Sequence, residues 1–288
     1  MGLQMQRSLS HVSFSICSDL RRRQIDLLRK HRGGSVDLEV NEKTGIALMT
    51  LNNPKKKNAI TGSMHLEFEE RIEELEKWET GKGLIVKGCG NTFCSGGDLN
   101  FVRALAKEKD SDNPSLMSSF MQNATTRLSN LPLITVALVE GFAVGGGAEL
   151  MTCCDFRVVH SSARIGFLEA QMGLSTGWGG SVRLVHLLGR SKALQLLTSA
   201  RVISGIDAQK IGLADEIFGE SDDPLEATTS FLTKYLKFPS EVIKAMKRVA
   251  VNASKSDSKS VEHLNAKETD IFQNLCGGPA NLAALNRK

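Results

Sequence analysis

Two glycine-rich stretches decide the fold of this 288-residue chain: FCSGGD at residues 93–98 and GFAVGGGAEL at residues 141–150. Each follows an apolar run typical of a buried strand, residues 84–86 for the first stretch and residues 133–139 for the second. The second stretch continues into a helical pattern, and the first N–H groups of a helix have no acceptor inside that helix. If the two turns converged, they could place two N–H donors on one substrate oxygen, as enzymes that stabilise an enolate do. The sequence alone leaves their convergence open.

These stretches resemble the two oxyanion-hole motifs of the crotonase superfamily, also called the enoyl-CoA hydratase/isomerase family. The resemblance continues through LNNPKKKNA at 51–59, ARIGFLE at 163–169 and GGSVRL at 179–184, and it covers roughly residues 35 to 253. A single glycine-rich turn would be a weak signal, whereas several motifs in the family's order are a specific one. The resemblance implies the α/β class, with a crotonase-like stacked ββα spiral core and a C-terminal helical subdomain.

The order of the patterns divides the chain into three parts. We expect a basic, poorly ordered N-terminal arm at 1–34, the α/β core at 35–223 and the C-terminal helical subdomain at 224–288. Strands that alternate with helices indicate a stacked core with right-handed crossovers. Strands are predicted at 45–51, 83–86, 133–139, 155–160 and 164–167, and helices at 20–28, 61–78, 178–188, 190–199, 225–237, 240–253 and 257–275, with a further helix from Gly145 and a mobile helix-loop at 101–115.

The composition is typical of a globular chain, with 41% hydrophobic and 24% charged residues. Residues 1–34 contain seven Lys/Arg and two acidic residues, a net charge of +5. The rest of the chain therefore has a net charge of −1, which together gives the total of +4. This near-neutral body argues against a nucleic-acid surface. Six cysteines without metal-ligand spacing predict reduced thiols and no metal site. No apolar run approaches the roughly 20 residues of a membrane span, so we expect no membrane association.

The N-terminal arm is rich in Ser and Arg and poor in acids, as mitochondrial transit peptides are. The alternative is a solvated basic lead-in with a short helix. A resemblance to decarboxylases within the family, described below, implies the cytosol, so we expect a cytosolic protein, with the mitochondrial matrix as the alternative.

The resemblance assigns the oxyanion donors to the N–H groups of Gly97 and Gly146. Glycine suits both positions because the backbone must approach a thioester closely, although each glycine could simply permit a tight turn. Glu149 follows Gly146 by three residues and therefore projects from about the same side of the helix. In such an apolar segment it needs a partner such as Arg157, or a proton, or a ligand to act on. Glu169 occupies the position of the family's second glutamate, or is a solvated residue near a helix start.

The resemblance also implies an acyl-CoA substrate, whose coenzyme A is part of the substrate, so no separate cofactor is expected. The lysine run at 55–57 could attract its phosphates, with Lys55 at the matching position, or could be a solvated charge run. Leu174 and Trp178 are expected to form apolar walls around the acyl group. The further substrate-binding positions are Ala59, Ser95 and Asp98.

Within the family, several segments resemble decarboxylases of small alkylmalonyl-CoA thioesters, with ethylmalonyl-CoA and methylmalonyl-CoA as candidate substrates. They are GGSVDL at 33–38, FMQN at 120–123, LPLI at 131–134, WGG at 178–180 and GGPANL at 277–282. Loss of CO₂ from a malonyl thioester leaves an enolate, so two oxyanion donors supply most of the catalysis and a proton donor completes it.

One residue departs from that resemblance, because a histidine is expected where Glu169 stands. The pair Glu149 and Glu169 looks more like an enoyl-CoA hydratase/isomerase, in which paired carboxylates position and activate water. Hydration therefore stays the main alternative.

Two other function classes find less support. GLSTG at 173–177 fits the G-x-S-x-G nucleophile pattern of serine hydrolases, but no clean strand precedes it. A non-catalytic RNA-binding relative would need a basic stripe that the near-neutral body lacks.

The predicted helices after residue 225 carry more apolar side chains than one lid would need, among them Val242, Ile243, Met246 and Val249. We therefore expect a homotrimer, or a dimer of trimers, whose contacts are made largely by these helices.

Overall fold

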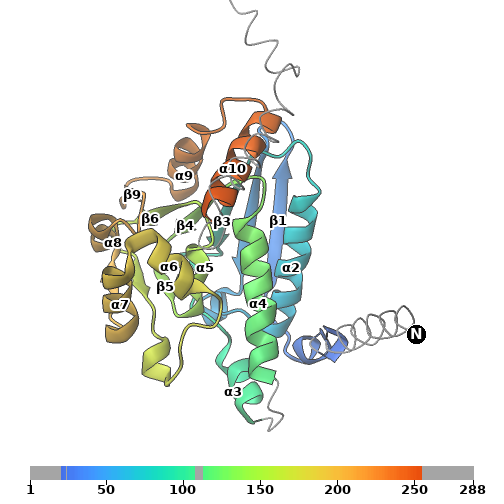
Figure 1. The fold of residues 1–288 in the computed structure, drawn as a ribbon, viewed down its shortest axis with the longest axis vertical. Helices are drawn as coiled ribbons and strands as arrows, with labels where there is room; N and C mark the ends of the chain where they lie inside the picture. The colour runs from blue at the N-terminus through green and yellow to red at the C-terminus, as the bar shows by residue number, and fades with distance from the viewer. Residues whose placement is uncertain (1–20, 24, 108–112, 255–288) are drawn as a thin grey trace, which may run out of the picture.

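The computed structural model describes residues 21–23, 25–107 and 113–254. Within them, a six-stranded sheet in the order β1-β2-β3-β4-β6-β9 forms the centre of the fold (Figure 1). Its strands are β1 (Ser35–Asn41), β2 (Ile46–Asn52), β3 (Gly83–Gly88), β4 (Ile134–Val139), β6 (Phe156–His160) and β9 (Glu216–Phe218). β1 and β2 are antiparallel, and every later neighbour in this sheet is parallel.

Helices cover both faces of this sheet. α2 (Gly62–Glu76) and α4 (Asn113–Ser129) pack on one face, where Phe68 and Ile72 belong to the same buried core as Leu84. α9 (Pro224–Thr233) and α10 (Ser240–Ser254) bring Phe231, Leu232 and Ile243 against Ile85, Val136 and Leu138 on the other face. Because successive strand residues point to opposite faces, the apolar runs of β3 and β4 supply both cores.

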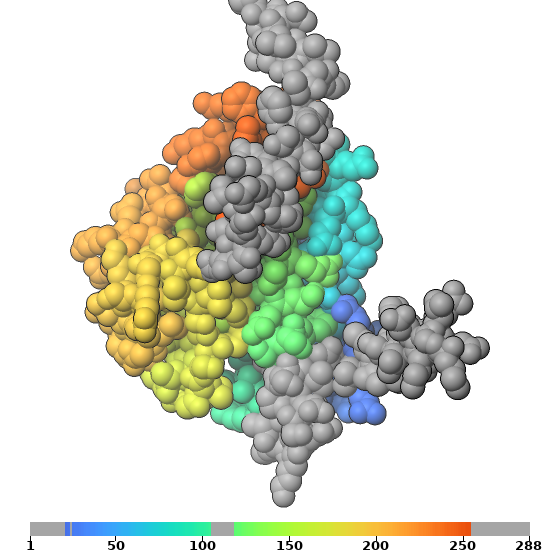
Figure 2. All heavy atoms as spheres, viewed as in Figure 1, coloured from blue at the N-terminus to red at the C-terminus, as the bar shows by residue number. Residues whose placement is uncertain are grey.

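A second sheet of three strands carries the glycine-rich part of the chain. It consists of β5 (Phe142–Val144), β7 (Arg164–Gly166) and β8 (Ile203–Ser204). The remaining helices are α3 (Leu99–Lys107), α5 (Gly146–Met151), α6 (Gly180–Leu188), α7 (Arg190–Ser199) and α8 (Gly205–Ile211), with 3₁₀ turns at Pro54–Lys56 and Glu169–Met172. In the space-filling view, the green atoms of α4 meet the yellow atoms of the α6 region (Figure 2).

The predicted alternation of strands and helices is confirmed, and the α/β class with it. The short elements β8, α8 and β9 were not predicted, nor was β1, an edge strand in which Val36 is the one buried residue. α5 ends at Met151, and the buried residues Cys153 and Cys154 lie in the turn after it. The predicted helix at 257–275, the segment 277–282 and most of the N-terminal arm lie outside the described residues. No helix of the described part is long and apolar enough to cross a membrane.

Candidate active site

The two glycine-rich stretches do converge. The N–H of Cys94 donates to the carbonyl of Phe142 at 2.9 Å, and the N–H of Val144 donates to the carbonyl of Cys94 at 3.1 Å. These bonds pair Cys94 with Ala143 as neighbouring parallel residues. Segments almost fifty residues apart are therefore held side by side by backbone hydrogen bonds.

Glycine allows the close approach of the two stretches. Gly96 has φ +93°, and a Cβ atom there would lie 3.0 Å from the nitrogen of Gly146 and 3.2 Å from the carbonyl oxygen of Val144. Any larger residue at Gly96 would be strained and would push the two turns apart. The glycine is thus needed both for the conformation and for the contact.

The N–H groups of Gly97 and Gly146 are free to bind a ligand. Ile60 pairs with the two neighbours of Gly97, through the carbonyl of Gly96 at 2.8 Å and the N–H of Asp98 at 2.9 Å, which leaves the Gly97 N–H outside the ladder. Gly146 is the first residue of α5, where an N–H has no intrahelical acceptor. Among the described residues, neither N–H has a hydrogen-bond acceptor.

Both glycines line one cavity of about 250 Å³. Its wall is largely apolar, with one carboxyl group, and consists of Ser95, Gly96, Gly97, Leu99, Val102, Val144, Gly145, Gly146, Leu168, Glu169, Gln171, Met172 and Leu174. Two backbone donors in a small apolar cavity can stabilise an oxygen on which negative charge develops.

Of the two expected apolar walls, the structure places Leu174 in the cavity lining, with 58% of its surface exposed. Trp178 lies elsewhere: it is 4% exposed, and its ring packs behind the glycines. A Cβ atom on Gly146 would lie 2.7 Å from that ring, and one on Gly97 would lie 3.9 Å from it. Trp178 therefore supports the two donors from behind, which corrects the expectation that it lines the cavity.

Glu149 is buried, at 1% exposure, and its partners are backbone groups. Its carboxylate accepts N–H hydrogen bonds from Gly177 at 3.1 Å and from Trp178 and Gly180 at 2.8 Å each. Of the alternatives for Glu149, the pairing with Arg157 is wrong, because the Arg157 guanidinium binds Asp215 and the carbonyl of Leu213.

Glu169 differs from Glu149 in that its carboxyl group accepts no hydrogen bond from the described residues. Both its carboxyl oxygens are buried, and neither has a partner among the described residues. Burial first, and then the neighbouring Glu149 carboxylate, raise the pKa of Glu169 from the ordinary 4.5 to about 7. Its Oε1 atom would lie 3.8 Å from a Cβ atom on Gly145, next to the oxyanion donors. The alternative of a solvated glutamate is therefore wrong, and the group is poised to hold or give a proton near neutral pH.

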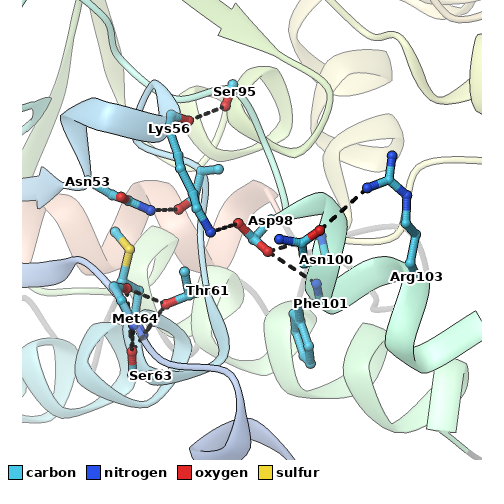
Figure 3. A network of polar contacts seen from close by, with 12 residues as sticks. Asn53, Lys56, Thr61, Ser63, Met64, Ser95, Asp98, Asn100, Phe101 and Arg103 are labelled. Atoms are coloured by element: carbon cyan, nitrogen blue, oxygen red, sulfur yellow. Dashed lines mark hydrogen bonds and ion pairs between the residues drawn. The ribbon is translucent and has the colours of Figure 1, made fainter.

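The lysine run lies beside the first turn, and Figure 3 shows its central member reaching the turn. Lys56 Nζ lies 2.6 Å from Asp98 Oδ2, while Asp98 Oδ1 accepts the N–H groups of Asn100 at 3.0 Å and Phe101 at 3.1 Å (Figure 3). Burial acts to raise the pKa of Asp98, but the hydrogen bonds from Lys56 and from these N–H groups outweigh it and lower that pKa. Asp98 thus caps α3 and fixes the turn that carries Gly97.

The other predicted binding positions surround this turn. Lys55 is exposed, and Lys57 Nζ lies 4.4 Å from the ring centre of Phe142. Ser95 lines the cavity and donates its hydroxyl to the carbonyl of Lys56 at 3.1 Å, whereas Ala59 is buried at 7% exposure.

Sequence reasoning missed several lining residues and one supporting residue. Leu99 and Val102 lie three residues apart on α3, a spacing that puts them on one helix face and could have predicted them. Arg183, in the GGSVRL motif, binds the loop that carries Trp178, which only the three-dimensional structure reveals.

Comparison with known proteins gives one consistent picture. The family model described as enoyl-CoA hydratase/isomerase matches residues 41–276. Ethylmalonyl-CoA decarboxylase of Gallus gallus is 46% identical over 263 residues, which cover 91% of this chain and 86% of that protein. The protein of the same description from Homo sapiens is 41% identical and covers 91% of this chain and 83% of its own.

Solved structures agree on the fold. The enoyl-CoA hydratase of Bacillus anthracis superposes with a TM-score of 0.78 at 22% identity, covering 87% of this chain and 94% of that one. The enoyl-CoA hydratase of Thermoplasma volcanium GSS1 has a TM-score of 0.76 at 28% identity, covering 88% of this chain and 97% of that one.

The raised pKa of Glu169 predicts a pH-dependent effect on stability. The carboxyl ionises near pH 4.5 when unfolded and near pH 7 when folded, so the native state loses stability as the pH rises from about 4.5 to about 7. Glutamine cannot ionise, so Glu169→Gln should raise the melting temperature relative to wild type at pH 8 more than at pH 4.5. Glu39→Gln, at an exposed position, is the matched control and should show no such trend. An equal Glu169→Gln effect at both pH values in calorimetric melts would contradict the assigned environment.

Proposed function

This chain belongs to the enoyl-CoA hydratase/isomerase family, and on that basis we propose that it is a carboxy-lyase that decarboxylates small alkylmalonyl-CoA thioesters, ethylmalonyl-CoA above all. The observation that carries the proposal is the pair of N–H donors of Gly97 and Gly146, which have no acceptor among the described residues and line one small apolar cavity. The relatives described as ethylmalonyl-CoA decarboxylase, identical at 41% and 46% over about nine-tenths of this chain, support the choice of reaction.

The cavity suits the first step, which breaks the bond between the α-carbon and the carboxylate. CO₂ leaves, and the electrons of that bond move to the thioester oxygen to form an enolate, whose charge the N–H groups of Gly97 and Gly146 stabilise. The lining side chains of Leu99, Val102 and Leu174 disfavour a localised carboxylate more than the spread-out charge of the transition state.

The second step needs a proton on the α-carbon, and Glu169 is the donor we assign. Its pKa of about 7 keeps a substantial fraction protonated at neutral pH. Transfer of that proton gives the saturated acyl-CoA, butyryl-CoA from ethylmalonyl-CoA, and leaves a carboxylate that solvent reprotonates. Glu149 is a poor candidate for this step because its oxygens already accept three backbone N–H groups.

Hydration of an enoyl-CoA is the second candidate. It is favoured by Glu169 itself, which stands where the resemblance to the decarboxylases predicts a histidine. A protonated carboxyl next to a second carboxylate could add water across a double bond.

A substrate comparison tests the assignment. Wild-type protein is incubated with ethylmalonyl-CoA, methylmalonyl-CoA and crotonyl-CoA, and products are identified by mass spectrometry. We expect CO₂ release and butyryl-CoA from ethylmalonyl-CoA. Rapid hydration of crotonyl-CoA with ethylmalonyl-CoA left intact would contradict the proposal. In Glu169→Gln, CO₂ release should persist at a lower rate because the oxyanion donors remain, whereas a hydratase would lose nearly all water addition.

A homotrimer, or a dimer of trimers, also belongs to the proposal. Ile243, one of the residues expected at the contact, is buried within the protomer. Met246 is 64% exposed, and two further apolar side chains, Phe238 and Val182, are 62% and 60% exposed. We expect light scattering at micromolar concentration to give a trimer mass or a multiple of it, and a uniform monomer would contradict this.

Cytosolic residence, with the mitochondrial matrix as the alternative, stays a prediction that cell fractionation tests.

A further inference from the structure

The loop at residues 177–180 connects the catalytic cavity to α6, and it carries the tryptophan that supports both oxyanion donors. One side of the loop is held by the Glu149 carboxylate, through the N–H groups of Gly177, Trp178 and Gly180. A Cβ atom on Gly180 would lie 2.4 Å from Cγ of Glu149, so the loop and this side chain are in direct contact. Three of the four N–H groups of the loop are thus satisfied by one acid.

The carbonyl side of the loop is held by Arg183, one turn into α6. Its Nη2 donates to the carbonyl of Trp178 at 2.7 Å and to that of Glu149 at 3.3 Å, and its Nε donates to Thr152 Oγ1 at 3.0 Å. Nη1 lies 3.5 Å from Thr125 Oγ1 on α4, and that hydroxyl also donates to the Trp178 carbonyl at 3.0 Å. One guanidinium therefore joins the loop, the end of α5 and α4.

The shape and charge of arginine fit this position. A guanidinium has five N–H donors in a rigid plane, and here it reaches acceptors on three separate segments, which a lysine ammonium could not reproduce. The carbonyl of Glu149 and Thr152, the C-cap residue, lie at the C-terminal end of α5, where a cation is favoured by the helix dipole. Gly146, whose N–H is an oxyanion donor, begins the same helix.

Arg183 does not line the catalytic cavity, so its influence has to pass through Trp178. The Trp178 ring lies against the position where Gly146 would carry a Cβ, at 2.7 Å, and near that of Gly97, at 3.9 Å. Its other neighbours include His65, whose ring centre is 5.8 Å away with an edge-to-face orientation. Movement of the 177–180 loop would withdraw the ring from both glycines.

We propose that Arg183 is a positioning residue for the oxyanion hole: together with the Glu149 carboxylate it clamps the 177–180 loop, so that Trp178 fixes the N–H groups of Gly97 and Gly146. The clamp acts on the donors and not on substrate affinity, so its loss should lower kcat and leave KM nearly unchanged. The proposal rests on the proposed function only for the existence of an enolate or oxyanion at these two donors.

The test uses tryptophan fluorescence and kinetics together. The chain has two tryptophans, so Trp78→Phe leaves Trp178 as the single emitter. In that background we compare Arg183→Met, Arg183→Lys and, as a matched control, Arg190→Met, an exposed arginine at the start of α7. Arg183→Met should lower kcat about 10²-fold with KM within about 3-fold, because small displacements of catalytic groups cause losses of this size. In this variant the emission of Trp178 should shift to the red, and its ring should become more accessible to the quencher acrylamide.

Arg183→Lys should recover little of either property, because it restores the charge without the planar donors. Arg190→Met should match its parent in both. Wild-type kcat, or unchanged Trp178 emission, in Arg183→Met would overturn the proposal.

A milder variant covers the case in which Arg183→Met does not fold. Thr152→Val removes one acceptor of Arg183 at constant shape, and it should lower kcat about 3–10-fold with a smaller red shift. No change in either quantity would overturn the proposal. Rates are measured on whichever thioester the wild type converts, so failure of the decarboxylase assignment in the substrate comparison is distinguished from failure of the clamp.

Discussion

The backbone pairing between Cys94 and the Phe142–Val144 strand is the constraint on which the site depends. It has two hydrogen bonds, at 2.9 and 3.1 Å, yet it decides that the N–H groups of Gly97 and Gly146 face one cavity. Because Gly96 touches the nitrogen of Gly146, the pairing leaves no room for a side chain between the turns. The Lys56–Asp98 ion pair and the Asp98 cap on α3 then fix the first turn, and the Glu149 and Arg183 contacts hold the 177–180 loop, whose Trp178 ring packs against the glycines.

The two glutamates divide the remaining chemistry because their surroundings differ. Glu149 is surrounded by N–H donors and serves the architecture, whereas Glu169 has buried oxygens without partners and a pKa of about 7. The neighbouring Glu149 carboxyl group contributes to the raised pKa of Glu169, so the structural residue also tunes the acid.

The sequence predicted the fold class, the central strands and the two glycine turns, because buried strands and glycine turns leave local signals in the pattern of residues. It could not predict that the turns converge, since that depends on pairing between segments far apart in the chain. Arg157 was one suggested partner of Glu149, and the backbone N–H groups that bind it could not be predicted because N–H groups of a distant loop leave no trace in residue type. Trp178 was expected in the cavity wall because its apolar character is evident from the sequence. The side of the glycines on which its ring packs depends on the three-dimensional structure. β1 was not predicted because only one of its seven residues, Val36, is buried, so its sequence lacks the apolar pattern of a buried strand.

The central claim is that the N–H groups of Gly97 and Gly146 bind one thioester oxygen, and isotope-edited difference infrared spectroscopy tests it most directly. Butyryl-CoA labelled with ¹³C at its thioester carbonyl is bound to the protein, and its stretching frequency is compared with that of the free thioester in water. Two backbone donors in an apolar cavity should polarise the carbonyl and shift the band to lower frequency than water does. A bound carbonyl whose band lies at or above its frequency in water would contradict the account.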